Sequence, residues 1–291
     1  MDYLIPRFLC ALLAGAIISQ CGSLIQMSTR NILASPSTLG FDGLGVLWVL
    51  IIHSFLLILG HDQPILASVF FGIPVSIIIG WVYSKFMARQ NKIERLILTG
   101  LTFNLLVGAI FSFWQFLFLA FNLPFPIELW FGHFRFADLE SLIVLGIIEL
   151  LILIGWFSLK KEFLVFSLGK SVSKNLHLAQ SKLYLVLFIC VSLGTFAVIS
   201  LFGAFSFLGL IFPIIARRMW FTKFDLKGEL IIGALVNGFS LMAIDVVCYY
   251  FPIYGAEVPV GLIATGVGAV SLILILWQSD TRMEILAKSP K

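Results

Sequence analysis

Residues 205–216 read Phe-Ser-Phe-Leu-Gly-Leu-Ile-Phe-Pro-Ile-Ile-Ala and follow directly on a long apolar segment at 183–203. The stretch is apolar but too short to cross a bilayer comfortably, because a hydrocarbon core of ~30 Å takes about 20 helical residues. It also holds Gly209 and Pro213, which interrupt a helix. At membrane depth a broken helix is tolerated only where protein buries it or where it lines a cavity. Two interpretations follow: a half-helix lining a transport pathway, or a tilted short helix packed in a bundle.

Apolar segments of full membrane length flank this stretch on both sides. They lie at about 8–28, 39–59, 64–84, 96–120, 141–159, 183–203, 228–250 and 259–277. Of the 291 residues, 60% are hydrophobic and 12% are charged, whereas a soluble domain has about 25% charged residues. The sequence therefore predicts an all-α polytopic membrane protein, a single domain over residues 1–291, with about nine membrane segments in the lipid bilayer.

Basic residues fall almost entirely on one side of the predicted membrane. Of the 19 Lys and Arg residues, all except Arg7 and Arg135 belong to inter-helix loops that alternating crossings place together. The positive-inside rule makes this side cytoplasmic. An odd number of crossings then puts the N-terminus outside and the C-terminus in the cytoplasm. Because this charge distribution is that of membrane loops, we expect no nucleic-acid partner despite a pI of about 8.9.

Ionisable residues inside a membrane need a physical reason. Asp42 and Asp245 lie near predicted membrane edges, where the cost is small, but Glu149 lies in the middle of a span. Glu149 either pairs with a polar neighbour or is protonated. A proton relay would need a second carboxylate beside it.

The sequence contains no arrangement of residues typical of an enzyme or of a metal site. Histidines do not stand at ligand spacing. The triplet Gly169-Lys170-Ser171 resembles the end of a P-loop, but Leu164 occupies the position of its first glycine. We therefore predict a non-catalytic subunit without bound metal or cofactor, whose energy, if it is ATP, comes from a partner subunit.

The longest loop on the basic side covers about residues 160–182. It mixes apolar and polar residues at a spacing compatible with short helices, and Phe163, Phe166 and Leu168 are candidates for exposure beside lysines. Such a surface suits docking to a cytoplasmic protein. The alternative is an amphipathic helix lying on the inner leaflet.

Several segments, in order, resemble the motifs of one transporter family. They are Pro6-Arg7, Ala14-Gly15-Ala16, Cys21-Gly22, Gln26, Arg30-Asn31 through Gly40, Glu94-Arg95 through Gly100, Leu168-Gly169 through Leu178, Phe207 through Arg217, and Glu257-Val-Pro259-Val-Gly261. The family is that of the permease subunits of iron-siderophore, haem and vitamin B12 ABC importers, the FecCD/BtuC-like permeases. The Arg30-Asn31 and Ser35-Pro36-Ser37-Thr38 segments are nearest its iron-siderophore branch.

This resemblance implies a BtuC-like fold and a set of partners. Family members have ten helices and work as permease dimers, with two cytoplasmic ATPase subunits and an extracytoplasmic substrate-binding protein. A heterodimer with a second permease is expected here, and a homodimer is the alternative. The matched positions imply docking of the binding protein at Arg7 and Glu257, and an inner gate and pathway at Ile93, Glu94, Asn104, Phe207, Gly209 and Pro213. ATPase coupling is implied at Ser167, Leu168, Gly169, Lys170, Ser171, Asn175, Leu176, His177 and Leu178.

This chain departs from the family pattern at several positions. It begins close to the family's second helix, so the usual first helix is absent from the sequence, either because the start is truncated or because this subunit lacks that helix. Of the opening arginine pair only Arg7 is present, and Tyr249 stands where a further docking arginine is expected. Coupling positions differ at Lys170 and His177, and Ile214 follows Pro213 where the family has histidine.

The leading hypothesis is therefore an ABC importer permease for an iron(III)-siderophore-type chelate in the inner membrane. Haem or vitamin B12 is an alternative cargo. A secondary transporter driven by an ion gradient is the rival from another class, and Glu149 is the one mid-membrane carboxylate that the sequence offers it.

Overall fold

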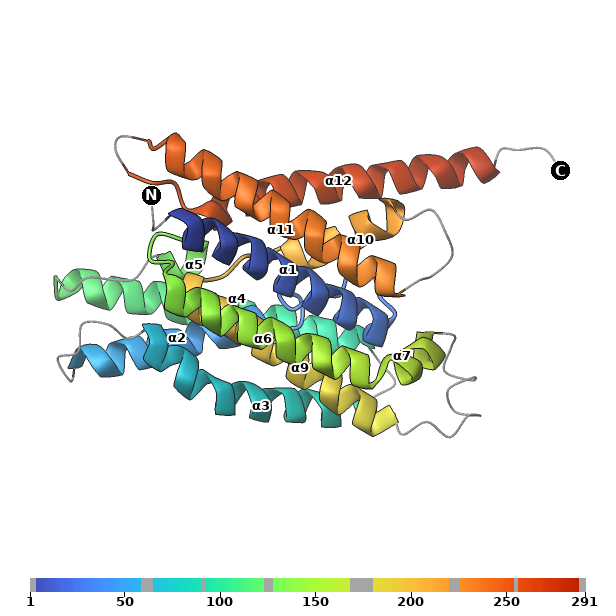
Figure 1. Cartoon of the computed structure of the whole chain (residues 1–291), viewed down its shortest axis with the longest axis horizontal. Helices are drawn as coiled ribbons and strands as arrows, with labels where there is room; N and C mark the ends of the chain where they lie inside the picture. The colour runs from blue at the N-terminus through green and yellow to red at the C-terminus, as the bar shows by residue number, and fades with distance from the viewer. Residues whose placement is uncertain are drawn as a thin grey trace.

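A computed structural model describes residues 4–58, 65–89, 93–122, 128–167, 180–219, 226–253 and 256–287, and these form a helical bundle. Its long helices are α1 (Leu4–Thr29), α2 (Phe41–Ile58), α3 (Ile65–Arg89), α4 (Ile93–Ala120), α6 (Leu139–Ser158), α9 (Gln180–Phe202), α11 (Leu226–Tyr250) and α12 (Val260–Ala287). Shorter helices are α5 (Glu128–Phe131), α7 (Lys160–Ser167) and α10 (Leu208–Met219). The start of α1 and the end of α12 lie towards opposite ends of the long axis (Figure 1).

Each of the nine predicted segments corresponds to a helix in this part of the chain, so the all-α fold is confirmed. Six helices among the described residues are long and apolar enough to cross a membrane. The apolar parts of α2 and α12, Phe41–Leu56 and Val260–Leu274, are shorter. The prediction missed α5, and it ended the last segment about ten residues too early, because the polar extension of α12 carries no hydropathy signal.

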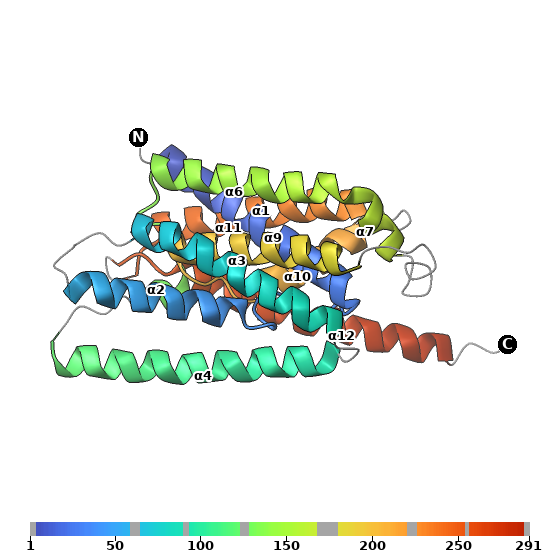
Figure 2. The same cartoon turned by 90° about the horizontal axis from the view of Figure 1, so that it is seen from below.

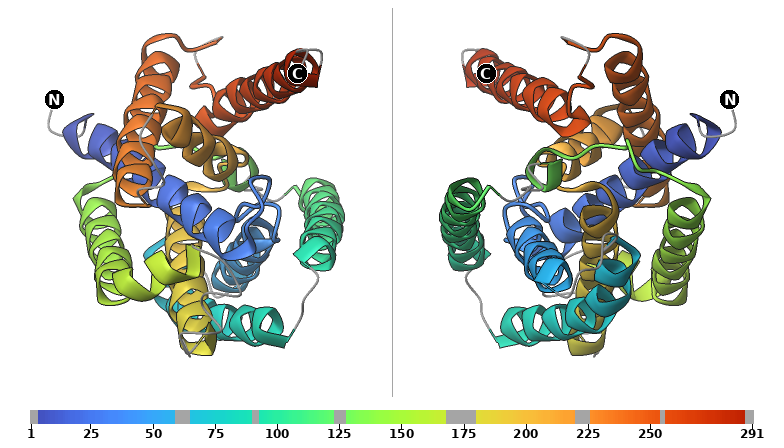
Figure 3. Two further views of the ribbon diagram at one scale, coloured as in Figure 1. Left: turned by 90° about the vertical axis from the view of Figure 1, so that its right-hand side faces the viewer. Right: turned by 90° about the vertical axis from the view of Figure 1, so that its left-hand side faces the viewer.

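Most of the contacts that assemble the bundle involve α1 and α9. The α1 helix packs on α6, α9, α10 and α11, and α9 packs most extensively on α3. Viewed end-on, α1 runs obliquely from the edge of the bundle into its middle (Figure 3). By contrast, α4 lies along one side against α2, and most of its surface is exposed (Figure 2).

Contrary to the prediction that basic residues fall in loops, several of them lie within helices. Lys85, Arg95, Lys182 and Arg217 all lie within the terminal turns of long or short helices. The helices extend past the hydrocarbon core, and long basic side chains reach the membrane interface from such positions. The bias to one end of the bundle is unaffected by this correction.

The short segment at 205–216 is a packed helix. After α9 ends at Phe202, residues 203–205 are irregular and buried. The segment after α5 supplies a hydrogen-bond partner for the interrupted backbone, because His133 N donates to Phe202 O at 2.8 Å. Phe207, at φ 68°, accepts hydrogen bonds from Leu210 N and Ile211 N and so starts α10. Most of α10 is buried, which favours the packed alternative.

The crossing of α1 and α10 is tight enough to require glycine. A Cβ atom on Gly22 would lie 1.7 Å from the carbonyl oxygen of Gly209, and Gly209 itself faces Ile18 O and Pro36. Small residues allow helix backbones in membranes to approach this closely. The pattern Cys21-Gly22 therefore marks a contact between helices that are almost two hundred residues apart.

We predict that Gly22→Ala destabilises the protein by about 1–3 kcal/mol, because the added methyl forces two backbones apart. The matched control is Gly146→Ala, where a Cβ meets no atom within 4 Å. That change should be neutral or stabilise by less than about 1 kcal/mol, through helix propensity. Thermal unfolding of the detergent-purified variants measures both, and equal effects at the two sites would contradict the tight crossing.

Candidate functional site

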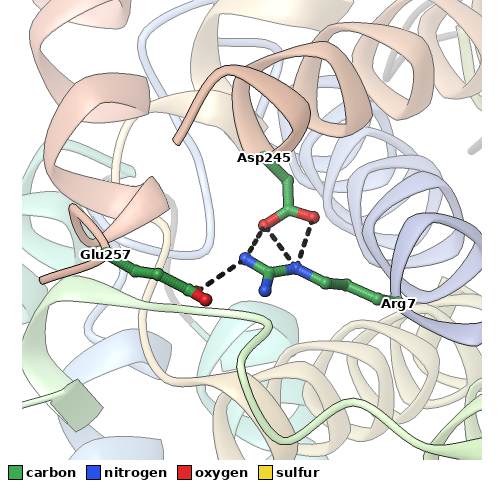
Figure 4. A network of polar contacts seen from close by, with 3 residues as sticks. All are labelled: Arg7, Asp245 and Glu257. Carbon is green, nitrogen blue, oxygen red and sulfur yellow. Dashed lines mark hydrogen bonds and ion pairs between the residues drawn. The ribbon is translucent and has the colours of Figure 1, made fainter. Parts of the chain in front are cut away.

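Arg7, in the first turns of α1, lies at the centre of an ion-pair network (Figure 4). Its Nε donates to Asp245 Oδ2 at 2.9 Å and its Nη2 to Asp245 Oδ1 at 2.8 Å, so the pair is bidentate. The same Nη2 is 3.0 Å from Glu257 Oε2. The guanidinium also lies over the ring of Tyr249, 4.9 Å from its centroid. The network joins α1 to the end of α11 and to the segment before α12.

Asp245 lies near the end of α11, which agrees with a position near a membrane edge, but its side chain is fully buried within the protein. A buried carboxylate is tolerated when it is paired and hydrogen-bonded, and Arg7 supplies both. Arg7 is 1% exposed and Glu257 is 31% exposed. A docking protein can therefore reach Glu257 directly, whereas contact with Arg7 would require the ion pairs to open.

A second polar cluster lies at the opposite end of α1. Gln26 Nε2 donates to Leu210 O at 2.8 Å, and Arg217 donates to Gln26 Oε1. Arg217 Nε also pairs with Glu229 Oε1 at 3.0 Å. These contacts tie α1, α10 and α11 together at the basic end of the bundle.

Glu149 has a partner, as one of the two sequence-based alternatives proposed. Gln20 Nε2 of α1 donates to Glu149 Oε1 of α6 at 2.7 Å. Among the described residues, no second carboxylate is bonded to Glu149. The same residues contain no group of three His, Cys, Asp or Glu side chains that could hold a metal ion.

Asn104 joins α4 to the first turn of α2 and to the turn that precedes it. Its Oδ1 accepts from Gly43 N at 3.1 Å, and its Nδ2 donates to Ser37 O. Both ends of the amide are thus engaged by backbone, while the side chain stays partly exposed. The expected role of Asn104 in a pathway stays a prediction. For Ile93 and Glu94 the structure describes the start of α4 but not the side chains.

A cavity lies beside the break between α9 and α10. Gly209 borders it, whereas Pro213 is buried in α10 and Phe207 is 37% exposed. The wall is formed by Ile18, Pro36, Ser37, Asp42, Thr195, Val198, Ile199, Phe205 and Gly209. Ser37 and Asp42 give it polar groups, and Gly209 gives it backbone. Of the pathway candidates Phe207, Gly209 and Pro213, only Gly209 borders this cavity, and the pathway role of all three stays a prediction.

The expected coupling segment is described only at its beginning. α7 ends at Ser167, and Leu168, Gly169, Lys170, Ser171, Asn175, Leu176, His177 and Leu178 lie outside the described residues. The expectation that Phe163 is exposed is wrong, because its side chain is 1% exposed within the main hydrophobic core. Helix α7 turns that ring inward, a direction that mixed polarity alone does not reveal.

The sequence model of the FecCD transport family matches residues 1–278 of this chain. The chain belongs to this family. The FecCD assignment agrees with the ordered motifs and with the helical architecture.

Characterised relatives include transporters for more than one cargo. The chain is 27% identical to the petrobactin import permease FatD of Bacillus anthracis, over 94% of this chain and 79% of that one. It is 27% identical to the ferric enterobactin permease FepG of Escherichia coli K12, over 97% and 83%. It is also 27% identical to the vitamin B12 permease BtuC of Salmonella typhi, over 94% and 82%.

Solved structures share the fold. One is an ABC transporter assigned to the metal-chelate type in an inward-facing conformation, with a TM-score of 0.75 at 22% identity over 94% of this chain and 85% of that one. Another is PsaBC of Streptococcus pneumoniae in complex with a Fab, with a TM-score of 0.58 at 16% identity over 93% and 91%. The BtuC-like permease fold is confirmed by these similarities.

We predict that Asp245→Asn lowers the free energy of unfolding by about 3–5 kcal/mol, because it leaves the charge of Arg7 buried without its main counter-ion. The double variant Arg7→Met/Asp245→Leu should lose less than Asp245→Asn, since it removes both charges. Arg135→Gln, which removes an exposed cation at the same end, should change stability by no more than about 0.5 kcal/mol. Thermal unfolding in detergent measures all three, and wild-type stability of Asp245→Asn would refute a stabilising pair.

Proposed function

We propose that this chain is the permease subunit of an ABC importer that carries an iron(III)-siderophore-type chelate across the inner membrane. The observation that carries the proposal is the match of the family model to residues 1–278. Relatives of the chain are named for petrobactin import and for ferric enterobactin transport. The relative named for vitamin B12 is equally similar. The choice of a siderophore therefore rests on the Arg30-Asn31 and Ser35–Thr38 motifs, and haem or vitamin B12 is the alternative cargo.

The driving force in this proposal is ATP hydrolysis by a separate subunit at the basic end of the bundle. Exposed Lys161, Lys182 and Arg218 gather at that end, and α7 leads directly into the proposed coupling segment. The positive-inside rule supports a cytoplasmic position for it. The end that carries Arg7 and Glu257 then faces outward, towards a substrate-binding protein.

The proposal includes a second permease subunit. Apolar side chains cover the outer surface of α4, and few contacts attach this helix to its own chain. The apolar start of α12 is similarly exposed. Both surfaces suit lipid or a second subunit, and the siderophore motifs favour a heterodimer over a homodimer. A pathway between two subunits would pass the proposed inner gate at Ile93 and Glu94, where α4 begins.

The energy source provides the first test. Tagged chain purified from its native membrane should carry an ATPase subunit, and uptake of the ferric chelate by cells should stop when ATP is depleted. Collapse of the ion gradients at maintained ATP should leave most of the uptake. If the chain purifies without an ATPase and ionophores alone abolish uptake, the secondary-transporter hypothesis replaces this one.

Docking of the binding protein provides a second test, at Glu257. Because Glu257 is partly exposed and Asp245 remains as the buried counter-ion of Arg7, Glu257→Gln should disturb docking more than folding. We expect stimulation of ATP hydrolysis by the binding protein to fall about fivefold or less, as for an exposed ion pair. Hydrolysis without the binding protein is the internal control. Unchanged stimulation at low ionic strength would remove Glu257 from the docking surface.

A further inference from the structure

The outer face of α3 is an apolar surface that ends in a cation. The helix lies at the edge of the bundle (Figure 1) and packs on α2 and α9 through its other face. Lys85 is exposed and follows Trp81 by one turn. The exposed apolar side chains of this face are Phe70, Phe71, Ile77, Ile78, Trp81 and Val82. They recur at helical spacing, so they form one continuous surface that lipid or protein must cover.

Lys85 holds its charge beside an exposed tryptophan. Its Nζ lies 5.5 Å from the centroid of the Trp81 ring. Side chains of a helix lean towards its N-terminus, so the ammonium group of Lys85 is directed back along α3 towards the apolar surface. Tryptophan side chains at the ends of membrane helices lie at the level of the lipid headgroups. The charge of Lys85 therefore lies at that level too.

A second cation lies at the same depth on the neighbouring helix. Ser192 Oγ donates to Ser76 O at 2.7 Å, and a Cβ atom on Gly80 would lie 2.8 Å from Phe188 O. These two contacts make α3 and α9 antiparallel. Continuing their register brings the last turns of α3 level with the first turn of α9, where Lys182 is exposed.

The protein supplies no counter-ion for these two lysines. Among the described residues, no acidic side chain forms an ion pair with Lys85 or Lys182. The surface thus combines apolar side chains with uncompensated positive charge at headgroup depth. An anionic phospholipid matches both features, because its acyl chains cover apolar side chains while its phosphate meets the ammonium group. A zwitterionic lipid carries a cation of its own and fits less well.

We propose that Trp81 and Lys85 of α3 bind the headgroup of an anionic phospholipid, such as phosphatidylglycerol, whose acyl chains lie along the exposed face of the helix. The site adds a lipid to the partners named under the proposed function and does not depend on them.

Short-range quenching by labelled lipids provides the test. The native cysteines are buried, so Ile78→Cys, two turns before Lys85 on the same face, can be labelled selectively with a fluorophore. The labelled full chain is reconstituted in phosphatidylcholine vesicles that contain nitroxide-labelled phosphatidylglycerol or, as the reference, nitroxide-labelled phosphatidylcholine. Quenching should show about fivefold tighter binding of phosphatidylglycerol at this position, the attraction expected of one lysine. Raised salt should reduce this preference.

Variants in the labelled chain show whether Lys85 is responsible. Lys85→Gln should remove most of the preference, whereas Lys85→Arg should keep it because the charge remains. Lys161→Gln, which removes an exposed cation of α7 at the same end of the bundle, should also keep it. Thermal unfolding verifies that each variant is folded.

Three results would overturn the proposal. One is equal quenching by the two lipids, or a preference that survives Lys85→Gln. Another is the absence of quenching by either lipid, which would mean that protein covers this face of α3. The third is loss of the preference when inorganic phosphate is added at constant ionic strength, which would assign Lys85 to a free anion.

Discussion

The close approach of α1 to its neighbours is the constraint on which the other helices of the bundle depend. Gly22 touches the backbone of α10, and Gly15 does the same against Asn237 of α11. Asn237 Nδ2 donates to Gly15 O at 2.6 Å, so the second contact is also a hydrogen bond. In a bilayer the hydrophobic effect does not drive helices together, and packing with polar contacts must do so. Helix α1 provides both along most of its length.

Three polar residues of α1 each select a different partner helix. Arg7 binds α11 at one end, Gln20 binds α6 near the middle, and Gln26 binds α10 at the other end. Because a polar side chain without a partner is costly in hydrocarbon, each contact favours one rotation of α1 about its axis. Together they fix the orientation of a helix whose apolar residues show little preference for any face.

The sequence predicted the existence and approximate bounds of the membrane helices, because hydropathy over about 20 residues is a local property. It also predicted that a short broken helix follows 183–203. It did not predict that Arg7 forms a buried ion pair with Asp245, because residues far apart in sequence meet only through the tertiary fold. Nor did it reveal the inward direction of Phe163. The composition of a helix indicates that it enters a membrane, whereas its partners depend on the shapes of several helices at once.

The pairing of Arg7 with Asp245 also has a consequence for biosynthesis. The two residues are separated by 238 positions, and a ribosome adds roughly 5–20 residues per second. Arg7 therefore enters the membrane on the order of ten seconds or more before its counter-ion exists. During that interval the end of α1 can remain only at the interface or beside the insertion machinery. Helix α1 can therefore take its final position only after α11 has been made. A chain that stops before α11 leaves the charge of Arg7 unpaired, which quality control can recognise.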